Sequence, residues 1–173
     1  MSEHSIVAVE PERLDDLKPI WRTLYEHHLA LTPHLRERSR SIEEAWRARR
    51  EAEREWIANE PLTFVLAVES EDGYLGYAFV RVRAATFATS WSASDPLAEL
   101  SILAVLPQAR GRGVGSALLD AVEERLEELG VEDMAISVVT TNVDAMRLYE
   151  RRGAVQFVTE LVQRITGPTR VSR

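Results

Sequence analysis

Cysteine is absent from the 173-residue chain, and lysine occurs only once, as Lys18. Without cysteine the chain can form neither a disulfide nor a thiolate metal site, and this composition fits a reducing cytoplasm. No run of about 18 apolar residues occurs, so we expect no membrane-spanning helix. The first residues, MSEHSIVAVEPERLDD, lack the basic and apolar segments of a secretory signal. We therefore expect a cytoplasmic protein.

The charge balance is acidic, with a formal net charge of −7 at pH 7. This charge disfavours binding to polyanions, so we expect no nucleic-acid partner, and it favours cationic or amine partners by long-range steering. The length suits one domain with a sizeable core. We predict a single domain over residues 1–166 and a loose tail over 167–173.

Apolar periodicity along the chain predicts an α/β fold with a mixed central sheet flanked by helices. The order of elements reads β-α-α-β-β-β-α-β-α-β. We expect strands over 5–9, 62–70, 74–83, 97–106, 134–139 and 154–165. We expect helices over 17–31, 41–60, 114–129 and 143–152.

Polar residues at the expected helix starts predict how these helices are capped. Asp15 or Asp16 would cap the first helix, with Pro19 in its first turn. Ser41 and Glu44 have the spacing of a capping box. Asn142 would cap the last helix.

A basic, glycine-rich stretch, VLPQARGRGVGS, connects the apolar strand at 97–106 to the helix at 114–129. The first N–H groups of a helix have no partner within it, and with the helix dipole they form an anion site. Glycines allow close approach of the backbone, and Arg110 and Arg112 suit phosphate. The acidic residues of this helix begin only at Asp120. Together these features predict a pyrophosphate cradle.

Three other interpretations of the glycine-rich stretch remain open at this point. It could be only a tight turn between a strand and a helix. A mononucleotide P-loop needs G-x-x-x-x-G-K-[ST], and no lysine is present here. A dinucleotide fingerprint needs G-x-G-x-x-G/A. Gly111 and Gly113 fit its beginning, but Ser116 stands at the last position.

The segment ELSILAVLPQARGRGVGSALLDAVEE resembles motif A of the GNAT superfamily, the GCN5-related N-acetyltransferases. The family signature Q/R-x-x-G-x-G/A is met by Arg110, Gly113 and Gly115. The segment TNVDAMRLYERRGA resembles the next family element, N-x-x-A-x-x-x-Y-x-x-x-G-F. Its asparagine, alanine, tyrosine and glycine are matched in register by Asn142, Ala145, Tyr149 and Gly153. Ala154 departs from the usual phenylalanine, which concerns packing more than chemistry.

The resemblance implies the GNAT fold, with acetyl-CoA as cosubstrate. The strands at 97–106 and 134–139 would diverge and open a slot for the thioester, with Pro107 ending the first strand. The pantetheine arm would pair with the backbone at Leu103, Ala104 and Val105. The pyrophosphate would lie on Arg110, Gly111, Arg112, Gly113, Val114, Gly115 and Ser116. Dimers are common in the family, so the resemblance also allows a homodimer.

Two side chains are candidates for the proton transfers of acetyl transfer to an amine. Glu99 lies in an otherwise apolar strand, where desolvation would raise its pKa and suit it as general base. Alternatively, it is a strand-end residue that faces solvent. Tyr149 matches the family tyrosine and could donate a proton to the leaving sulfur, or it is a core aromatic. Asn142 could also contact the cofactor arm. The backbone amide of Leu103 is the candidate oxyanion donor.

Three histidines near the end of the first helix, His27, His28 and His34, raise the question of a metal site. His27 and His28 are adjacent, so they point to different helix faces, and we expect no metal. Together with Trp21, Tyr25 and Trp91, they either line the acceptor cleft or pack in the core.

The sequence therefore predicts an acetyl-CoA-dependent N-acetyltransferase. It would act on a primary amine of a small molecule or peptide, by direct transfer in a ternary complex. The alternative is a non-catalytic sensor domain that binds acyl-CoA through the same cradle. A nucleotide-binding fold is a third hypothesis.

Overall fold

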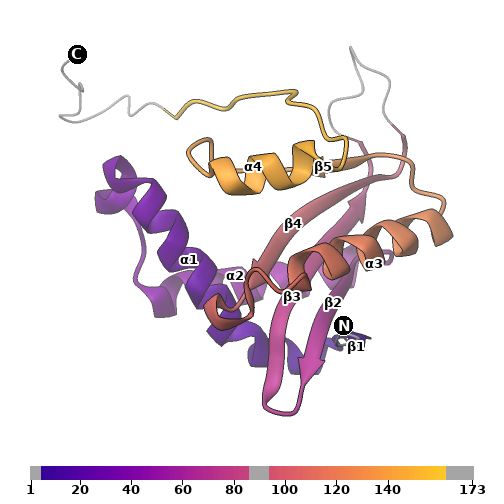
Figure 1. Ribbon diagram of the computed structural model, residues 1–173, viewed down its shortest axis with the longest axis horizontal. Coiled ribbons are helices and arrows are strands. Elements are labelled where there is room, and N and C mark those ends of the chain that lie inside the picture. Colours follow the sequence, from indigo (N-terminus) through magenta and orange to yellow (C-terminus); the bar gives the residue numbers. More distant parts are fainter. Residues whose placement is uncertain (1–4, 86–93, 163–173) are drawn as a thin grey trace. The chain divides into compact units, whose positions relative to one another are not determined.

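The computed structural model describes residues 5–85 and 94–162, and it divides the chain into two compact units. The first unit spans Met1–Ser137 and the second Val138–Arg173. The first unit contains β1 (Ser5–Ala8), η1 (Pro11–Leu17), α1 (Lys18–Leu31), η2 (Pro33–Arg38), α2 (Ile42–Asn59), β2 (Phe64–Ser70), β3 (Gly73–Arg83), β4 (Leu97–Val105), η3 (Pro107–Ala109), α3 (Val114–Glu128) and β5 (Met134–Ile136) (Figure 1). The second contains α4 (Val143–Glu150).

The five strands form one mixed sheet in the order β1-β2-β3-β4-β5. The first three pairs of neighbouring strands are antiparallel, and β4 and β5 are parallel. The predicted α/β fold with a mixed central sheet is confirmed. The β4–β5 ladder is short, since it joins only Ala98–Leu100 to Met134–Ile136.

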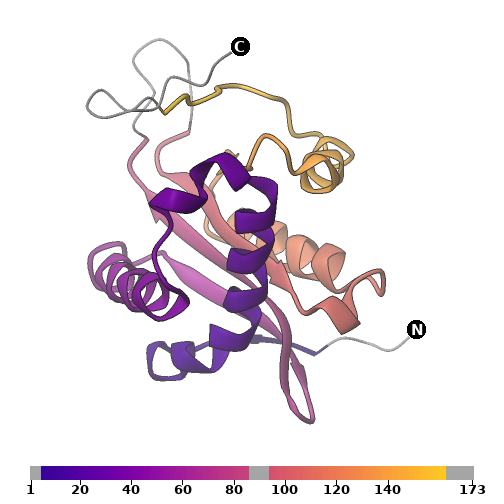
Figure 2. The same ribbon diagram turned by 90° about the vertical axis from the view of Figure 1, so that its left-hand side faces the viewer.

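Helices cover both faces of this sheet within the first unit (Figure 2). Successive residues of a strand point to opposite faces, so each strand contributes to two cores. On one face, Tyr77 and Phe79 of β3 pack with Trp21 of α1 and Trp46 of α2. The other face packs against α3, through a cluster of Val68, Ala109, Val114 and Leu118.

The caps of the helices agree with the sequence in two cases and differ in one. The capping box of α2 is confirmed, because the Glu44 amide donates to Ser41 Oγ and the Ser41 amide donates to the Glu44 carboxylate. Asn142 caps α4 as predicted. The prediction that Asp15 or Asp16 caps α1 is wrong. Pro11–Leu17 is a 3-10 helix that runs directly into α1, and Asp15 accepts from Arg50 instead.

The prediction of a strand over 154–165 is wrong for residues 154–162, which form no strand. Apolar and polar residues alternate there, as in a strand, but a strand requires a neighbour with which to form a ladder. The described residues of the second unit contain no other strand. Residues 163–165, the tail at 167–173 and Trp91 lie outside the described ranges.

Candidate active site

The connection from β4 to α3 is a compact turn within the first unit. β4 ends at Val105, and Pro107 opens the single turn of η3, so the predicted end of the strand before this proline is confirmed. The Leu106 amide donates to the Leu75 carbonyl, and the Ala109 amide donates to the Leu106 carbonyl. Ala109 is buried beneath the turn. These contacts fix the point from which the glycine-rich segment begins.

Two glycines of this segment adopt the left-handed conformation. Gly111 has φ +70° and Gly113 has φ +82°, a region that costs an L residue with a side chain about 1–2 kcal/mol. Gly113 is the N-cap of α3. A Cβ atom added at either position would meet no other atom within 4 Å. The outer side of the turn is therefore open to an approaching group.

The N-terminus of α3 presents its amides without a competing side chain. The Ala117 amide makes the first helical hydrogen bond, to the Gly113 carbonyl at 2.9 Å. The amides of Val114, Gly115 and Ser116 precede it and have no partner inside the helix. Within the described ranges no side chain caps α3, and its first turn holds no acidic residue. Positive potential therefore remains at this helix end, which suits a phosphate.

Arg110 and Arg112 add positive charge on the exposed side of the turn. Arg110 Nε donates to the Val105 carbonyl at 3.1 Å, which ties the start of the turn to the end of β4. This bond uses one of the five donors of a guanidinium group. The open space, the amides and the two arginines fit the diphosphate group of CoA, and we call residues Arg110–Ser116 the cradle.

The end of β4 next to the cradle has one unpaired edge. The β5 ladder stops at Leu100, and beyond it Ile102–Val105 pair only with β3 among the described strands. Because Leu106 donates to β3, the alternation of an antiparallel ladder turns the amides of Leu103 and Val105 to the opposite edge. The backbone at these two residues can therefore bond an extended ligand.

Glu99 lies in the middle of an ionic cluster rather than in an apolar setting. Its Oε2 accepts from Nε and Nη2 of Arg83 at 3.0 and 2.8 Å, and Arg81 Nη1 is 3.7 Å away. The side chain of Glu99 is 21% exposed. The prediction that Glu99 lies in an apolar, desolvating setting is therefore wrong, because two arginines of β3 compensate the charge of its carboxylate.

Sequence reasoning missed the arginine partners of Glu99, although a signal was present. Arg81 and Arg83 are two residues apart in β3, so they point to the same face of the sheet. In the antiparallel pairing of β3 with β4, Arg81 lies opposite Glu99. Two like charges at this spacing, facing a glutamate across a ladder, indicate an ion-pair cluster.

Asn142 and Tyr149 belong to the second unit. Asn142 Oδ1 accepts from the Ala145 amide at 3.3 Å, so its carbonyl oxygen caps α4. Tyr149 is half-buried in α4. Burial raises the pKa of Tyr149 to about 12, so its hydroxyl remains a proton donor at neutral pH.

The aromatic residues of α1 pack in the core. Trp21 is buried and stacks on Tyr25 with ring centroids 5.1 Å apart, and the Tyr25 hydroxyl donates to the Arg40 carbonyl. Burial, with His27 nearby, lowers the pKa of His28. In the described part of the chain, no three histidine, aspartate or glutamate side chains gather as a metal-binding group.

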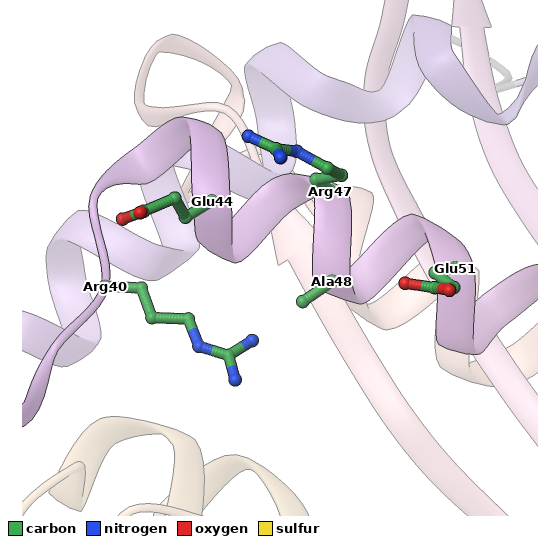
Figure 3. A pocket seen from close by; sticks show the side chains of 5 residues that line it. All are labelled: Arg40, Glu44, Arg47, Ala48 and Glu51. Atoms are coloured by element: carbon green, nitrogen blue, oxygen red, sulfur yellow. The ribbon is translucent and has the colours of Figure 1, made fainter.

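A shallow hollow lies on the outer surface of α2, lined by Arg40, Glu44, Arg47, Ala48 and Glu51 (Figure 3). Its two arginines and two glutamates balance in charge, and Glu44 is already used in the capping box of α2. The helix α2 packs on the sheet face opposite α3, so this hollow is separate from the cradle.

The family model for the acetyltransferase (GNAT) family matches residues 21–154. The chain belongs to this family. The match includes β4, the cradle and α3, and thus the part of the chain that resembles motif A. Among the described residues of this GNAT chain, no helix is both long and apolar enough to span a bilayer.

The chain is also similar in sequence to proteins that are named as acetyltransferases. The mycothiol acetyltransferase of Thermobispora bispora is 28% identical over 135 residues, which are 78% of this chain and 42% of that protein. The mycothiol acetyltransferase of Mycolicibacterium gilvum is 31% identical over 118 residues, which are 65% of this chain and 36% of that protein. The chain therefore spans less than half the length of these relatives.

Solved structures share the fold. A putative acetyl transferase from Pyrococcus furiosus has a TM-score of 0.71 at 25% identity, covering 94% of this chain and 100% of that one. The aminoglycoside N-acetyltransferase AAC(6')-Iy in complex with CoA has a TM-score of 0.64 at 16% identity, covering 94% and 100%. The similarity to the aminoglycoside N-acetyltransferase shows a shared fold only.

Proposed function

We propose that this GNAT-family chain is an acetyl-CoA-dependent N-acetyltransferase, acting by direct transfer to a primary amine of a small molecule or peptide. The observation that carries the proposal is the cradle, where uncapped helix amides, two left-handed glycines beside open space and two exposed arginines occur together. Family membership supports it, as do relatives that are named acetyltransferases. The absence of cysteine from the chain fits transfer without a cysteine acyl-enzyme.

Acetyl-CoA would be held by two parts of the first unit. The amides of Val114, Gly115 and Ser116, with Gly111, Gly113 and the side chains of Arg110 and Arg112, would hold the diphosphate. The free edge at Leu103, Ala104 and Val105 would pair with the amide-rich pantetheine arm. Acetyl-CoA supplies an activated acetyl group, whose carbonyl carbon bonds to the amine nitrogen as its bond to sulfur breaks.

Three groups of the chain would serve this transfer. Glu99 would accept the proton that the acceptor ammonium loses, which requires its carboxylate to be shared with Arg83. The Leu103 amide would donate to the carbonyl oxygen as negative charge develops on it. Tyr149 would donate a proton to the departing thiolate, since its raised pKa keeps the hydroxyl protonated. Asn142 would contact the arm through the amide nitrogen that its capping bond leaves available.

The net charge of −7 favours a cationic amine acceptor over a nucleic acid. The scheme uses no metal ion. We further propose that residues 1–166 act as one catalytic domain in the cytoplasm and that the chain can form a homodimer, as many members of the resembled family do.

A screen for release of free CoA against an amine library tests this function. The chain is incubated with acetyl-CoA and each amine, and the thiol released is measured with and without enzyme. Turnover with at least one amine, together with loss of turnover in Tyr149→Phe, is the expected result. If CoA binds but no amine in a broad library releases it, the chain is an acyl-CoA sensor and the catalytic proposal fails.

A further inference from the structure

The side chain of Arg49, in α2, contacts a residue of β4 on the sheet face that α2 covers. Its Nη2 donates to Ser101 Oγ at 3.0 Å, and its Nε donates to Glu53 Oε1 at 2.8 Å. Its guanidinium also lies over the rings of Trp56 and Phe79, 5.1 and 5.5 Å from their centroids. The side chain is 19% exposed and that of Glu53 is 2% exposed. Four contacts on different sides therefore fix one guanidinium in one place.

Ser101 is the extra residue of a β-bulge. Phe79 pairs with Ile102 and the next residue, Val80, pairs with Leu100, so no residue of β3 stands opposite Ser101. The bulge also lies where the β4–β5 ladder stops, since Leu100 is the last residue of β4 paired with β5. Bulges redirect the groups that follow them and are frequent beside active sites.

The bulge decides which edge of β4 the Leu103 amide faces. An extra residue shifts by one the alternation of every residue that follows it. Counted back from Leu106, which donates to β3, the Leu103 amide faces the unpaired edge. If β4 were regular, without the extra residue at Ser101, the alternation would be shifted by one. The Leu103 amide would then face β3 and form a hydrogen bond within the ladder.

We infer that Arg49 is a positioning residue that holds the bulge at Ser101 and thereby aims the Leu103 amide at the carbonyl oxygen of bound acetyl-CoA. The inference rests on the proposed function, because it needs acetyl-CoA at the free edge of β4. It adds a role for a charged pair on α2, Arg49 and Glu53, that motif A does not contain. Nothing in this role requires Arg49 to touch the substrate.

The arrangement of the charges allows Arg49 to be removed without leaving a buried carboxylate unpaired. Glu53 Oε2 also accepts from Arg50 Nη1 at 3.4 Å, and Arg50 donates in turn to Asp15 at 2.9 Å. Arg49→Met keeps the length and apolar contacts of the side chain. Ser101→Ala removes only a hydroxyl, and it tests the same contact from the other side.

The test observes the carbonyl directly. Acetyl-CoA labelled with carbon-13 at its carbonyl is bound to the full chain, and its carbon-13 resonance is recorded by NMR. A hydrogen bond to the oxygen moves this resonance downfield from that of free acetyl-CoA. In Arg49→Met and in Ser101→Ala, we expect the bound resonance to move most of the way back to the free position. The double variant should add little, because both substitutions break one contact.

Matched controls separate positioning from general damage. Arg47→Met removes an exposed arginine from the same helix and should keep the wild-type resonance. The affinity for CoA without an acetyl group should fall by less than about tenfold in all variants, since the cradle is untouched. If Arg49→Met does not fold, Ser101→Ala decides the question.

The outcomes distinguish this inference from the proposed function. If both variants bind acetyl-CoA with the wild-type carbonyl resonance, Arg49 has no positioning role and the proposed function stands. If the wild-type resonance is not displaced from that of free acetyl-CoA, the amide makes no such bond and the inference is overturned. If wild type does not bind acetyl-CoA at all, both the inference and the proposed function fail.

Discussion

Arg83 donates two hydrogen bonds to one carboxylate oxygen of Glu99, from Nε at 3.0 Å and from Nη2 at 2.8 Å. The sequence favours Glu99 as a general base because its strand is apolar, and the structure gives it a guanidinium partner instead. A base in this position must share its carboxylate between the arginine and the acceptor. The two residues therefore need separate substitutions to be understood.

Glu99→Gln should lower kcat/KM by about 10²–10⁴, because the amide cannot accept the proton from the acceptor ammonium. The measurement is the rate of CoA release with an amine found in the screen, over a range of pH. Arg83→Gln keeps the carboxylate and should retain turnover to within about tenfold. Equal losses in the two variants, or undiminished turnover in Glu99→Gln, would show that the pair serves the fold rather than the reaction.

Tyr149→Phe should lower kcat by about 10²–10⁴ with little change in the affinity for acetyl-CoA, since only the proton donor to sulfur is lost. Because the pKa of Tyr149 is raised to about 12, ionisation of this hydroxyl should cause no loss of rate below that alkaline range. A pH profile of kcat measures this. Tyr74→Phe is the control, since the buried Tyr74 hydroxyl has no hydrogen-bond partner in the described structure. Unchanged kcat in Tyr149→Phe would remove it from the mechanism.

Gly113→Val should weaken CoA binding sharply, because its side chain would fill the open space on which the diphosphate approaches. It also places a β-branched residue at φ +82°, which strains the backbone. Gly130→Val is a matched control at the other end of α3, where φ is +69° and the space is equally open. Calorimetry should show a loss of affinity in the first variant only. Similar affinities would mean that the cradle does not hold CoA.

Glu60→Gln should destabilise the fold by about 2 kcal/mol at neutral pH, because Arg81 loses a charged partner in a partly buried pair. Arg81 lowers the pKa of Glu60 from its usual value of 4.5. This stabilisation is present above the unfolded pKa and is lost as the pH falls through the folded pKa. The difference from wild type in urea unfolding should therefore shrink under acid conditions. Glu43→Gln, at an exposed pair with Lys18, should cause no measurable change.

The cradle could be predicted from the sequence because its chemistry is local. Gly111 and Gly113, the following helix and the two arginines are adjacent in the chain, and their conformations depend on neighbours in sequence. Family membership and the capping box of α2 could be predicted for the same reason. Each depends on a short pattern with a direct structural meaning.

The surroundings of Glu99 and Ser101 could not be predicted in this way, because they depend on pairing between distant segments. Arg83 meets Glu99 only when β3 and β4 pair in one register, and Arg49 meets Ser101 across 52 positions. The start of α1 failed as a prediction because Asp15 bonds to Arg50 of α2, a tertiary contact that overrides a local capping preference. Residues 154–162 show that strand patterning does not form a strand without a neighbour.

The central claim, that the backbone amides of the cradle hold a diphosphate, is tested most directly by NMR of the amide groups. Uniformly nitrogen-15-labelled chain is titrated with CoA and, separately, with pantetheine, which lacks the diphosphate. Our account predicts that the amides of Val114, Gly115 and Ser116 shift with CoA and not with pantetheine. If CoA binds while these amides keep their positions, the diphosphate lies elsewhere and the account is contradicted.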